Sequence, residues 1–236
     1  MSRSDHERIS VTARLAAYYR AFSDVPFASD VAKFIDAAQT FKTLVSTHDI
    51  QAAKLNEYAP IFEARYKSIA ALLLKLRATQ ILELASGFSL RGLTLARDHD
   101  VRYVESDLEA VNAEKQRLLA SLAVPLRGTH SVVTANALIA PQLSTAAAPF
   151  NRQGELFVVC EGLVQYRSVE ERETLAAHIR ALISDFSAGT WITPDFSMRA
   201  DSGLVSEERK RLIAAVAGLT ERQLDECAFE STTDLE

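Results

Sequence analysis

The stretch from Gln80 to Leu108 constrains the fold of this chain more than any other part of the sequence. An apolar run from Ile81 to Leu84 has the length of a strand and ends at the small residues 85–87. An amphipathic run from Leu90 to Ala96 follows, and then a second short strand from Val101 to Val104. The order strand, tight turn, helix and strand predicts a βαβ unit.

Two acids follow the second strand, Glu105 and Asp107. Asp107 lies 107 − 87 = 20 residues after Gly87, which is the spacing in a βαβ unit at which an acidic side chain meets a ribose. Asp107 could also cap the helix that follows it, and the two roles can coexist. The sequence therefore predicts a nucleotide-type cofactor at this point.

The turn after the first strand favours a cationic ligand over a phosphate. A glycine such as Gly87 allows a ligand to approach the backbone closely. A pyrophosphate site has several glycines at a helix N-terminus, but here Gly87 stands alone and Glu83 lies four residues before it. A carboxylate there would repel a pyrophosphate and suit the ammonium of a methionine moiety. This predicts S-adenosylmethionine, and an acid inside the first strand resembles the pattern of class I methyltransferases.

Composition excludes several other classes of protein. With 236 residues, 48% of them hydrophobic, the chain can bury one sizeable core, alone or with a small lid. A net charge of −5 argues against a nucleic-acid surface. Cys160 and Cys227 are too few for a disulfide framework or a zinc site, and the polar start MSRSDHERIS has no signal-peptide core. With no apolar run of about 18 residues to span a membrane, we expect a cytoplasmic protein that binds neither nucleic acid nor membrane.

Helices and strands then alternate along the chain. Residues 9–22 and 30–44 have helical spacing, and a further helical run continues past Pro60 to Leu76. We expect an N-terminal helical lid, residues 1–60, followed by a class I methyltransferase domain, residues 61–236. The predicted strands are residues 81–84, 101–104, 131–134, 155–160 and 190–193, separated by helices. This alternation predicts a doubly wound, mostly parallel sheet of the Rossmann-like α/β class.

The C-terminal part differs from the usual end of that fold. A helix is expected from Glu207 to Ala217, followed by a single weak strand from Glu226 to Phe229. The antiparallel strand pair that usually completes a class I methyltransferase sheet is therefore expected to be incomplete.

Several separated motifs resemble one family, the leucine carboxyl methyltransferases and their bacterial relatives that methylate polyketides and other small acids. ILELASGFSLRGLTL resembles that family's VNLGAGLDTRAYRL, and VRYVESDLEAVNAEKQRLL resembles YFEVDLPEVIERKRRLL. LFVVCEGLVQY resembles LFIAEGVLMY, and ARYKSI is similar to ARTRYID. The matches run in the family's order from Ala64 to Tyr166.

The resemblance implies roles for individual residues. Arg65 would pair with the methionine carboxylate of the cofactor, and Asp107 would take both ribose hydroxyls. Glu161 would face the ammonium group, and Tyr166 would border the substrate as the candidate catalytic residue. The full set of candidate cofactor residues is Arg65, Glu83, Ala85, Gly87, Asp107, Leu108, Asn136, Ala137 and Glu161, with Ala85 and Gly87 in the turn and Asn136 and Ala137 against the adenine. We expect Asp107 and Glu161 to close neighbouring strands at the same rim of the sheet.

The sequence also departs from the family pattern. Ala85 replaces the first family glycine, Ser89 an aspartate, Glu109 a proline and Asn136 the adenine-side acid. A methyl group at Ala85 could crowd the cofactor.

The position of Glu161 supports a functional role without the resemblance. It directly follows the six residues of an apolar strand, so it should lie at the carboxyl end of a buried strand, where ligands of open α/β sheets bind. Other residues also have simpler interpretations. Arg65 shares its helix with surface charges and could be a solvated arginine, while Tyr166 could be a packing residue. Lys115 is expected to snorkel from its helix, and Cys160 is expected in the core.

The expected reaction is transfer of a methyl group from S-adenosylmethionine to an oxygen. A carboxylate, with a pKa of about 4, is already ionised at neutral pH and needs no base, whereas a phenol, with a pKa near 10, would need one. A small-molecule or peptide carboxylate is therefore the favoured acceptor. Two alternatives remain: a binding or scaffold module that kept the fold without turnover, and, more distantly, a nicotinamide-dependent dehydrogenase.

Overall fold

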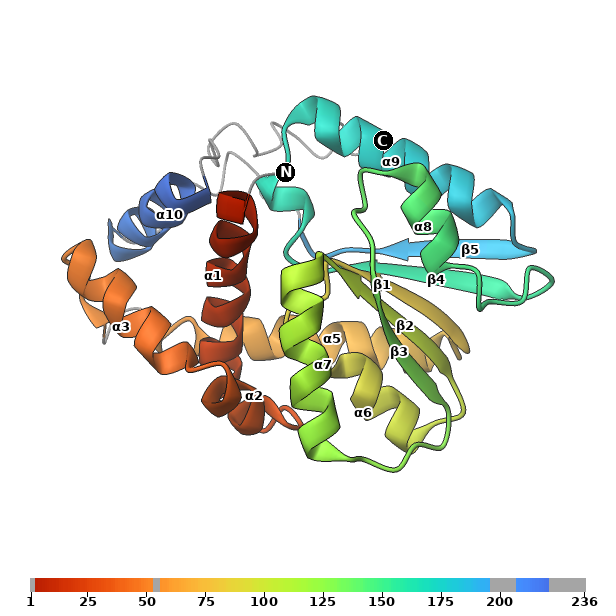
Figure 1. Cartoon of the computed structure of the whole chain (residues 1–236), viewed down its shortest axis with the longest axis horizontal. Helices are drawn as coiled ribbons and strands as arrows, with labels where there is room; N and C mark the ends of the chain where they lie inside the picture. Colours follow the sequence, from red (N-terminus) through yellow and green to blue (C-terminus); the bar gives the residue numbers. More distant parts are fainter. Residues whose placement is uncertain (1–2, 53–55, 196–206, 221–236) are drawn as a thin grey trace.

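The computed structural model describes residues 3–52, 56–195 and 207–220 and has a parallel sheet at its centre (Figure 1). The strands are β1 (Gln80–Leu84), β2 (Arg102–Asp107), β3 (Thr129–Thr134), β4 (Glu155–Cys160) and β5 (Ala188–Ile192). Their order is β3-β2-β1-β4-β5, and every pair of neighbours is parallel. The predicted Rossmann-like α/β fold is confirmed.

Helices cover both faces of this sheet, as a doubly wound fold requires. On one face, α5 (Ala59–Lys75) and α6 (Arg91–Asp98) pack against alternate residues of β1, β2 and β4. On the other face, α8 (Ala140–Ala146) and α9 (Val169–Ser184) pack against the intervening strand residues. The central strands are buried on both sides, which explains their near-continuous apolar runs.

Strand β2 is longer than predicted and includes both acids of its sequence. It begins at Arg102 and continues through Glu105 to Asp107, instead of ending at Val104. Glu105 and Asp107 are 0% and 5% exposed. The strand can continue through both acids because each finds a partner inside the protein: Glu105 pairs with Lys115, and Asp107 accepts from the N–H of Gly87.

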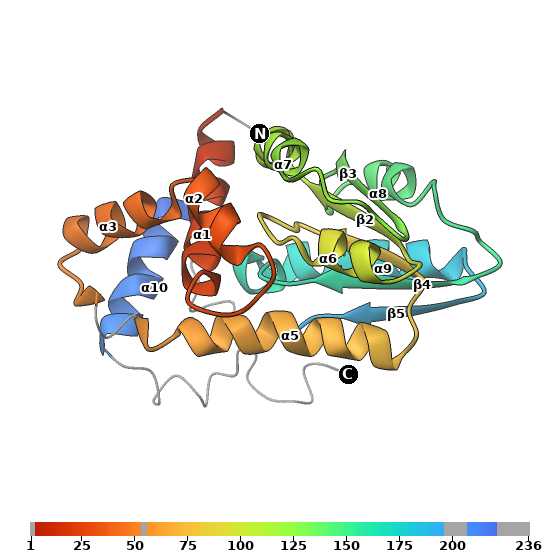
Figure 2. The same cartoon turned by 90° about the horizontal axis from the view of Figure 1, so that it is seen from below.

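Four of the described helices gather beyond the carboxyl ends of the strands; β5 points toward α1 in Figure 1. They are α1 (Arg3–Arg20), α2 (Ala28–Phe34), α3 (Ala37–Thr47) and α10 (Glu207–Thr220). Helix α7 (Glu109–Leu122) connects β2 to β3 and packs against these strands beside α6. The helix predicted over residues 30–44 is two helices, because Asp36 takes a left-handed conformation with φ 49° between α2 and α3. Figure 2 shows α1, α2, α3 and α10 together at one end of the molecule.

The C-terminal part of the chain was predicted to form a helix and a weak strand, and the structure describes the helix. Helix α10 spans Glu207–Thr220, three residues longer than predicted. The weak strand predicted over 226–229 lies outside the described residues. None of the helices in residues 3–52, 56–195 and 207–220 combines the length and apolarity needed to cross a bilayer.

Candidate active site

The strand register brings Asp107 and Glu161 to the same rim of the sheet. Leu84, the last residue of β1, pairs with Ser106 on one side and with Cys160 on the other. Asp107 and Glu161 are the next residues along their chains, so they flank Ala85 from both sides. The prediction of a shared rim is confirmed, but their strands are not neighbours, because β1 lies between them. Two strand spacings of about 4.8 Å set the backbones about 10 Å apart.

This rim is also the topological switch point of the sheet. From β1 the chain proceeds to β2 and β3 on one side and returns to β4 and β5 on the other. Ligands of open α/β sheets bind in the crevice outside the carboxyl ends of the strands at such a point. The β1–α6 turn, Asp107 and Glu161 are therefore where a ligand is expected.

Asp107 braces the turn that follows β1. Its Oδ2 accepts a hydrogen bond from the backbone N–H of Gly87 at 2.7 Å, and its Oδ1 accepts one from the N–H of Leu108 at 2.7 Å. Helix α7 has no side-chain cap, so helix capping does not account for the acid. A carboxylate offers about four acceptor sites, and two of them remain beyond these bonds. Burial raises the pKa of Asp107, and the two backbone N–H groups oppose that rise.

The turn itself has an unusual backbone. Ala85 has φ 51° and Gly87 has φ 52°, both in the left-handed region. A Cβ at Gly87 would lie 3.2 Å from the Cβ of Ala13 in α1. The absence of a side chain at Gly87 thus allows helix α1 to lie close to the turn, and not only a ligand.

Three arginines surround the carboxylate of Glu161. Arg20 Nη2 lies 3.1 Å from its Oε1, Arg65 Nε lies 3.7 Å from the same oxygen, and Arg91 Nη2 bonds Oε2. Burial would raise the pKa of Glu161, but Arg20, Arg91 and Arg65 outweigh it and lower the pKa to about 2. Glu161 is therefore an anion at any neutral pH.

Glu83, predicted to contact the cofactor, has other partners. Its carboxylate accepts from Arg91 Nη1 and from the hydroxyl of Tyr103 at 2.6 Å. It is 1% exposed, and burial raises its pKa against the opposing charge of Arg91. The guanidinium of Arg91 thus lies between Glu83 and Glu161.

Arg65 is part of a buried network and is not a solvated surface arginine. Its Nη2 donates to Oδ1 of Asp195 at 2.6 Å. Asp195 also accepts the backbone N–H groups of Gly162, Leu163 and Val164 at 2.8, 2.7 and 3.0 Å. This acid at the end of β5 fixes the segment directly after Glu161.

The adenine-side candidates lie further along the same rim. Ala135 N–H donates to the backbone oxygen of Asp107 at 3.0 Å, so Asn136 and Ala137 follow β3 beside β2. The Asn136 side chain accepts from the N–H of Leu138 at 3.0 Å, which shapes this loop.

Tyr166 lies on the side of the rim that faces the N-terminal helices. It is in the 3-10 helix η1 (Val164–Tyr166) and packs against a cluster formed by α1, α3, α5 and α10. Burial raises the pKa of Tyr166 to about 12. Its phenol stays protonated at neutral pH, so it can donate a hydrogen bond but cannot serve as a base.

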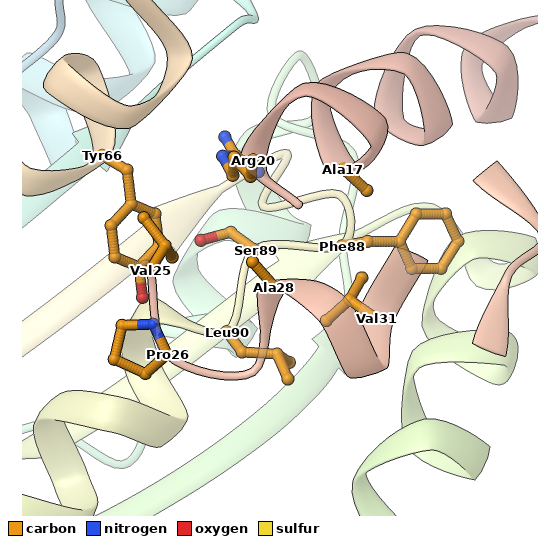
Figure 3. Close-up of a pocket in the computed structure, with 10 residues that line it drawn as sticks. All are labelled: Ala17, Arg20, Val25, Pro26, Ala28, Val31, Tyr66, Phe88, Ser89 and Leu90. Atoms are coloured by element: carbon orange, nitrogen blue, oxygen red, sulfur yellow. The ribbon is translucent and has the colours of Figure 1, made fainter. Parts of the chain in front are cut away.

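A cavity of about 10 Å³ lies between the α1–α2 segment and the turn (Figure 3). Among the residues that line it, Arg20, Tyr66 and Ser89 have polar side-chain atoms, and the others are apolar. This volume holds about one water molecule, so helix α1 and the segment after it close tightly over this part of the rim.

Sequence reasoning missed Arg20, Arg91 and Asp195 and misjudged Lys115. The ammonium of Lys115 does not snorkel: it is fully buried, pairs with Glu105 and donates to Ser86 Oγ at 3.0 Å. Asp195 lies three residues after the end of β5, at the same rim as Glu161, so the rule that acids after buried strands bind ligands or partners could have pointed to it. Arg91 is a lone cation in the apolar run 88–96, a sign of a buried partner.

Asp107 and Glu161 are both buried carboxylates at this rim. The parallel sheet and its order are those expected of a class I methyltransferase. A family model described as leucine carboxyl methyltransferase matches residues 15–180, more than half of the sequence. The chain belongs to this family and is a methyltransferase.

Two solved structures that resemble this chain differ in how well they superpose, and the first of them agrees with the fold. A DUF574 family protein from Streptomyces avermitilis is 13% identical with a TM-score of 0.63, covering 95% of this chain and 80% of that one. At this identity the likeness shows the fold alone. Magnesium protoporphyrin IX methyltransferase from Synechocystis, solved with bound SAH, is 17% identical over 50% of this chain and 49% of that one, with a TM-score of 0.37. No protein of curated function matches the sequence significantly.

Proposed function

We propose that this protein transfers a methyl group from S-adenosylmethionine to a carboxylate of a small molecule or peptide. The observation that supports it best is the placement of Asp107 and Glu161 at one rim, flanking the turn at residues 85–87. An adenosyl sulfonium compound carries hydroxyls and an ammonium at its two ends, and these two acids offer acceptors at matching ends of one crevice. The cofactor, when bound, would supply an electrophilic methyl group.

Each part of the cofactor then has a proposed binding residue. Asp107 would accept from the ribose hydroxyls with its remaining acceptor sites, beside Leu108. Glu161 would receive the ammonium, and Arg65 the carboxylate, for which it has to share its guanidinium with Asp195. The turn at Ala85 and Gly87 would lie beneath the ligand, and Asn136 and Ala137 beside the adenine. Glu83 is proposed as a support rather than a direct contact, because Arg91 and Tyr103 occupy its oxygens.

A carboxylate acceptor is favoured by the state of Tyr166. Since its pKa is raised to about 12, it cannot take a proton from a phenol or alcohol at neutral pH. It can donate a hydrogen bond to an acceptor that is already ionised and hold it in line with the methyl group. An ionised nucleophile needs only orientation and the exclusion of water.

We further propose that residues 1–60 act as a lid over residues 61–236. The support is that Ala13 lies against Gly87 and Arg20 against Glu161. Helix α1 therefore covers the turn and the acid at which the cofactor is proposed to bind. Entry of a ligand would require α1 to shift.

Binding and turnover are tested separately. Titration calorimetry with S-adenosylmethionine and S-adenosylhomocysteine should show heat for both, and no heat for either would refute the function. Methyl transfer is then followed with a cofactor labelled in its methyl group and a panel of carboxylic acids and phenols. A carboxylate product is an ester, so mild alkali should release the label as methanol; a label stable to alkali would place the methyl group on another atom.

A scaffold module without turnover is the second candidate. Arg20 already occupies the oxygen of Glu161 that faces the lid, and Ala85 replaces a family glycine. Heat of binding for both ligands, with no methyl transfer to any acid or phenol of the panel, would favour this function.

A further inference from the structure

We propose that Arg91 is a positioning residue for Glu161 in the cofactor site, and this inference rests on the proposed function. Arg91 is the first residue of α6 and is 0% exposed. Its two terminal nitrogens bond two different carboxylates, Nη1 that of Glu83 and Nη2 Oε2 of Glu161. One planar guanidinium thus joins Glu83, near the end of β1, to Glu161, the residue directly after β4.

The guanidinium is itself held in place. Glu83 lies within β1 and is tied to the hydroxyl of Tyr103 in β2 at 2.6 Å. The ring of Tyr66 in α5 lies 4.7 Å from the Arg91 guanidinium and stacks against it as a cation–π partner. Because β1 and β2 are both interior strands of the sheet, this support is built on strands that are paired on both sides.

The consequence is an oriented carboxylate at Glu161. Arg91 occupies Oε2, and so the other oxygen, Oε1, faces the lid side, where Arg20 of α1 and Arg65 of α5 approach it. Arg20 occupies Oε1 in this structure, so an ammonium would meet this oxygen once α1 has shifted, as ligand entry is proposed to require. The same guanidinium separates Glu83 from the ligand, which makes Glu83 the counter-ion that anchors Arg91. Glu83 and Arg91 together therefore hold the carboxylate of Glu161 in one orientation from inside the protein.

The test compares two ligands that differ only in the part Glu161 is proposed to bind. S-adenosylhomocysteine carries the amino-acid group, and 5′-methylthioadenosine is an adenosyl thioether without it. Arg91→Lys keeps the charge but cannot bridge two carboxylates, because an ammonium is a compact point charge without a planar fork. Calorimetry should show an affinity for S-adenosylhomocysteine about tenfold lower, and an affinity for 5′-methylthioadenosine changed by less than about twofold.

Two further variants serve as a control and as a second test. Arg97→Lys makes the same substitution on the same helix at a more exposed arginine that pairs with Asp98, and should change neither affinity. Glu83→Gln combined with Arg91→Met removes a buried charge pair without leaving either charge alone. This double variant keeps an acceptor for Tyr103, so it provides a folded protein if Arg91→Lys does not fold, and its selective loss should match.

The outcomes distinguish a failure of the proposed function from a failure of the positioning role of Arg91. If the native protein binds neither ligand, the proposed function fails. If the native protein binds both, and either folded Arg91 variant binds S-adenosylhomocysteine as tightly as the native protein, the positioning role is overturned. An equal loss for both ligands would also overturn it, since that is the mark of a general structural defect.

Discussion

The carboxylate of Asp107 accepts the backbone N–H of Gly87 at 2.7 Å, so the acid that ends β2 directly braces the turn that follows β1. The same side chain is the proposed ribose ligand. Any change at Asp107 should therefore affect both the shape of the turn and the adenosine end of a ligand.

We predict that Asp107→Ala lowers the affinity for S-adenosylhomocysteine and for 5′-methylthioadenosine alike. The loss should be about tenfold or more, because a hydrogen bond to a charged group contributes about 1.5–3 kcal/mol. Asp98→Ala, at an exposed acid paired with Arg97, is the calorimetric control. Retained affinity for both ligands would place the ribose elsewhere.

Ala85→Gly should stabilise the protein. Ala85 has φ 51°, and a left-handed conformation costs a residue with a side chain about 1 kcal/mol, which glycine avoids. We expect the free energy of unfolding in urea to rise by about that amount. Ala177→Gly, at an exposed position inside α9, should lower it by about 1 kcal/mol, so a loss at both positions would show that Ala85 is not strained.

Asp195→Asn should loosen the segment after Glu161. Asp195 accepts three backbone N–H groups and Arg65, and the amide nitrogen of asparagine cannot accept any of them. We expect a loss of about 2–3 kcal/mol of unfolding free energy and faster hydrogen exchange at residues 162–164. Asp185→Asn, at an exposed acid near Arg152, should show neither effect, and unchanged exchange in Asp195→Asn would contradict this role.

Acid should destabilise the protein in part through Glu105. Burial would raise its pKa, but Lys115 and His130 lower it to about 2 from an ordinary value of 4.5. Between these values the unfolded chain takes up a proton that the folded protein does not, so stability falls as the pH drops from about 5 to 2. One such group contributes a slope of at most about 1.4 kcal/mol per pH unit.

The double variant Glu105→Gln with Lys115→Met measures this contribution. Its unfolding free energy, followed in urea between pH 6 and 3, should fall less steeply than that of the native protein. The contribution of Glu161, whose pKa is also lowered to about 2, remains in both proteins. Equal slopes would mean that Glu105 does not titrate in this window.

The sequence was a good guide to the strands and to the acids at their ends. Period and apolar runs located the five strands of the described residues, because a buried parallel strand leaves a local signal of its own. The same logic placed Asp107 and Glu161 at one rim. The prediction that their strands are neighbours was wrong, because β1 lies between β2 and β4. That order depends on strand pairings that no local sequence pattern encodes.

The partners of those acids could not be read in the same way. Arg20, Arg65 and Arg91 come from three different helices and meet at Glu161 only after the chain has folded. Charged residues on helices usually face solvent, so Arg20 and Arg65 look ordinary in the sequence, and Arg91 differs only in being the lone cation of an apolar run. Lys115 was misjudged for that reason, and Glu83 was assigned to a ligand because its internal partners were hidden.

The central place of β1 has a consequence for synthesis of the chain. Its partner β2 emerges soon after it, but β4 begins only at Glu155, after β3 and two helices have been made. Until then one edge of an apolar strand stays unpaired, and such edges invite contact with other chains. We therefore expect a newly made chain to be vulnerable to aggregation in the interval after β1 has been made and before β4 pairs with it.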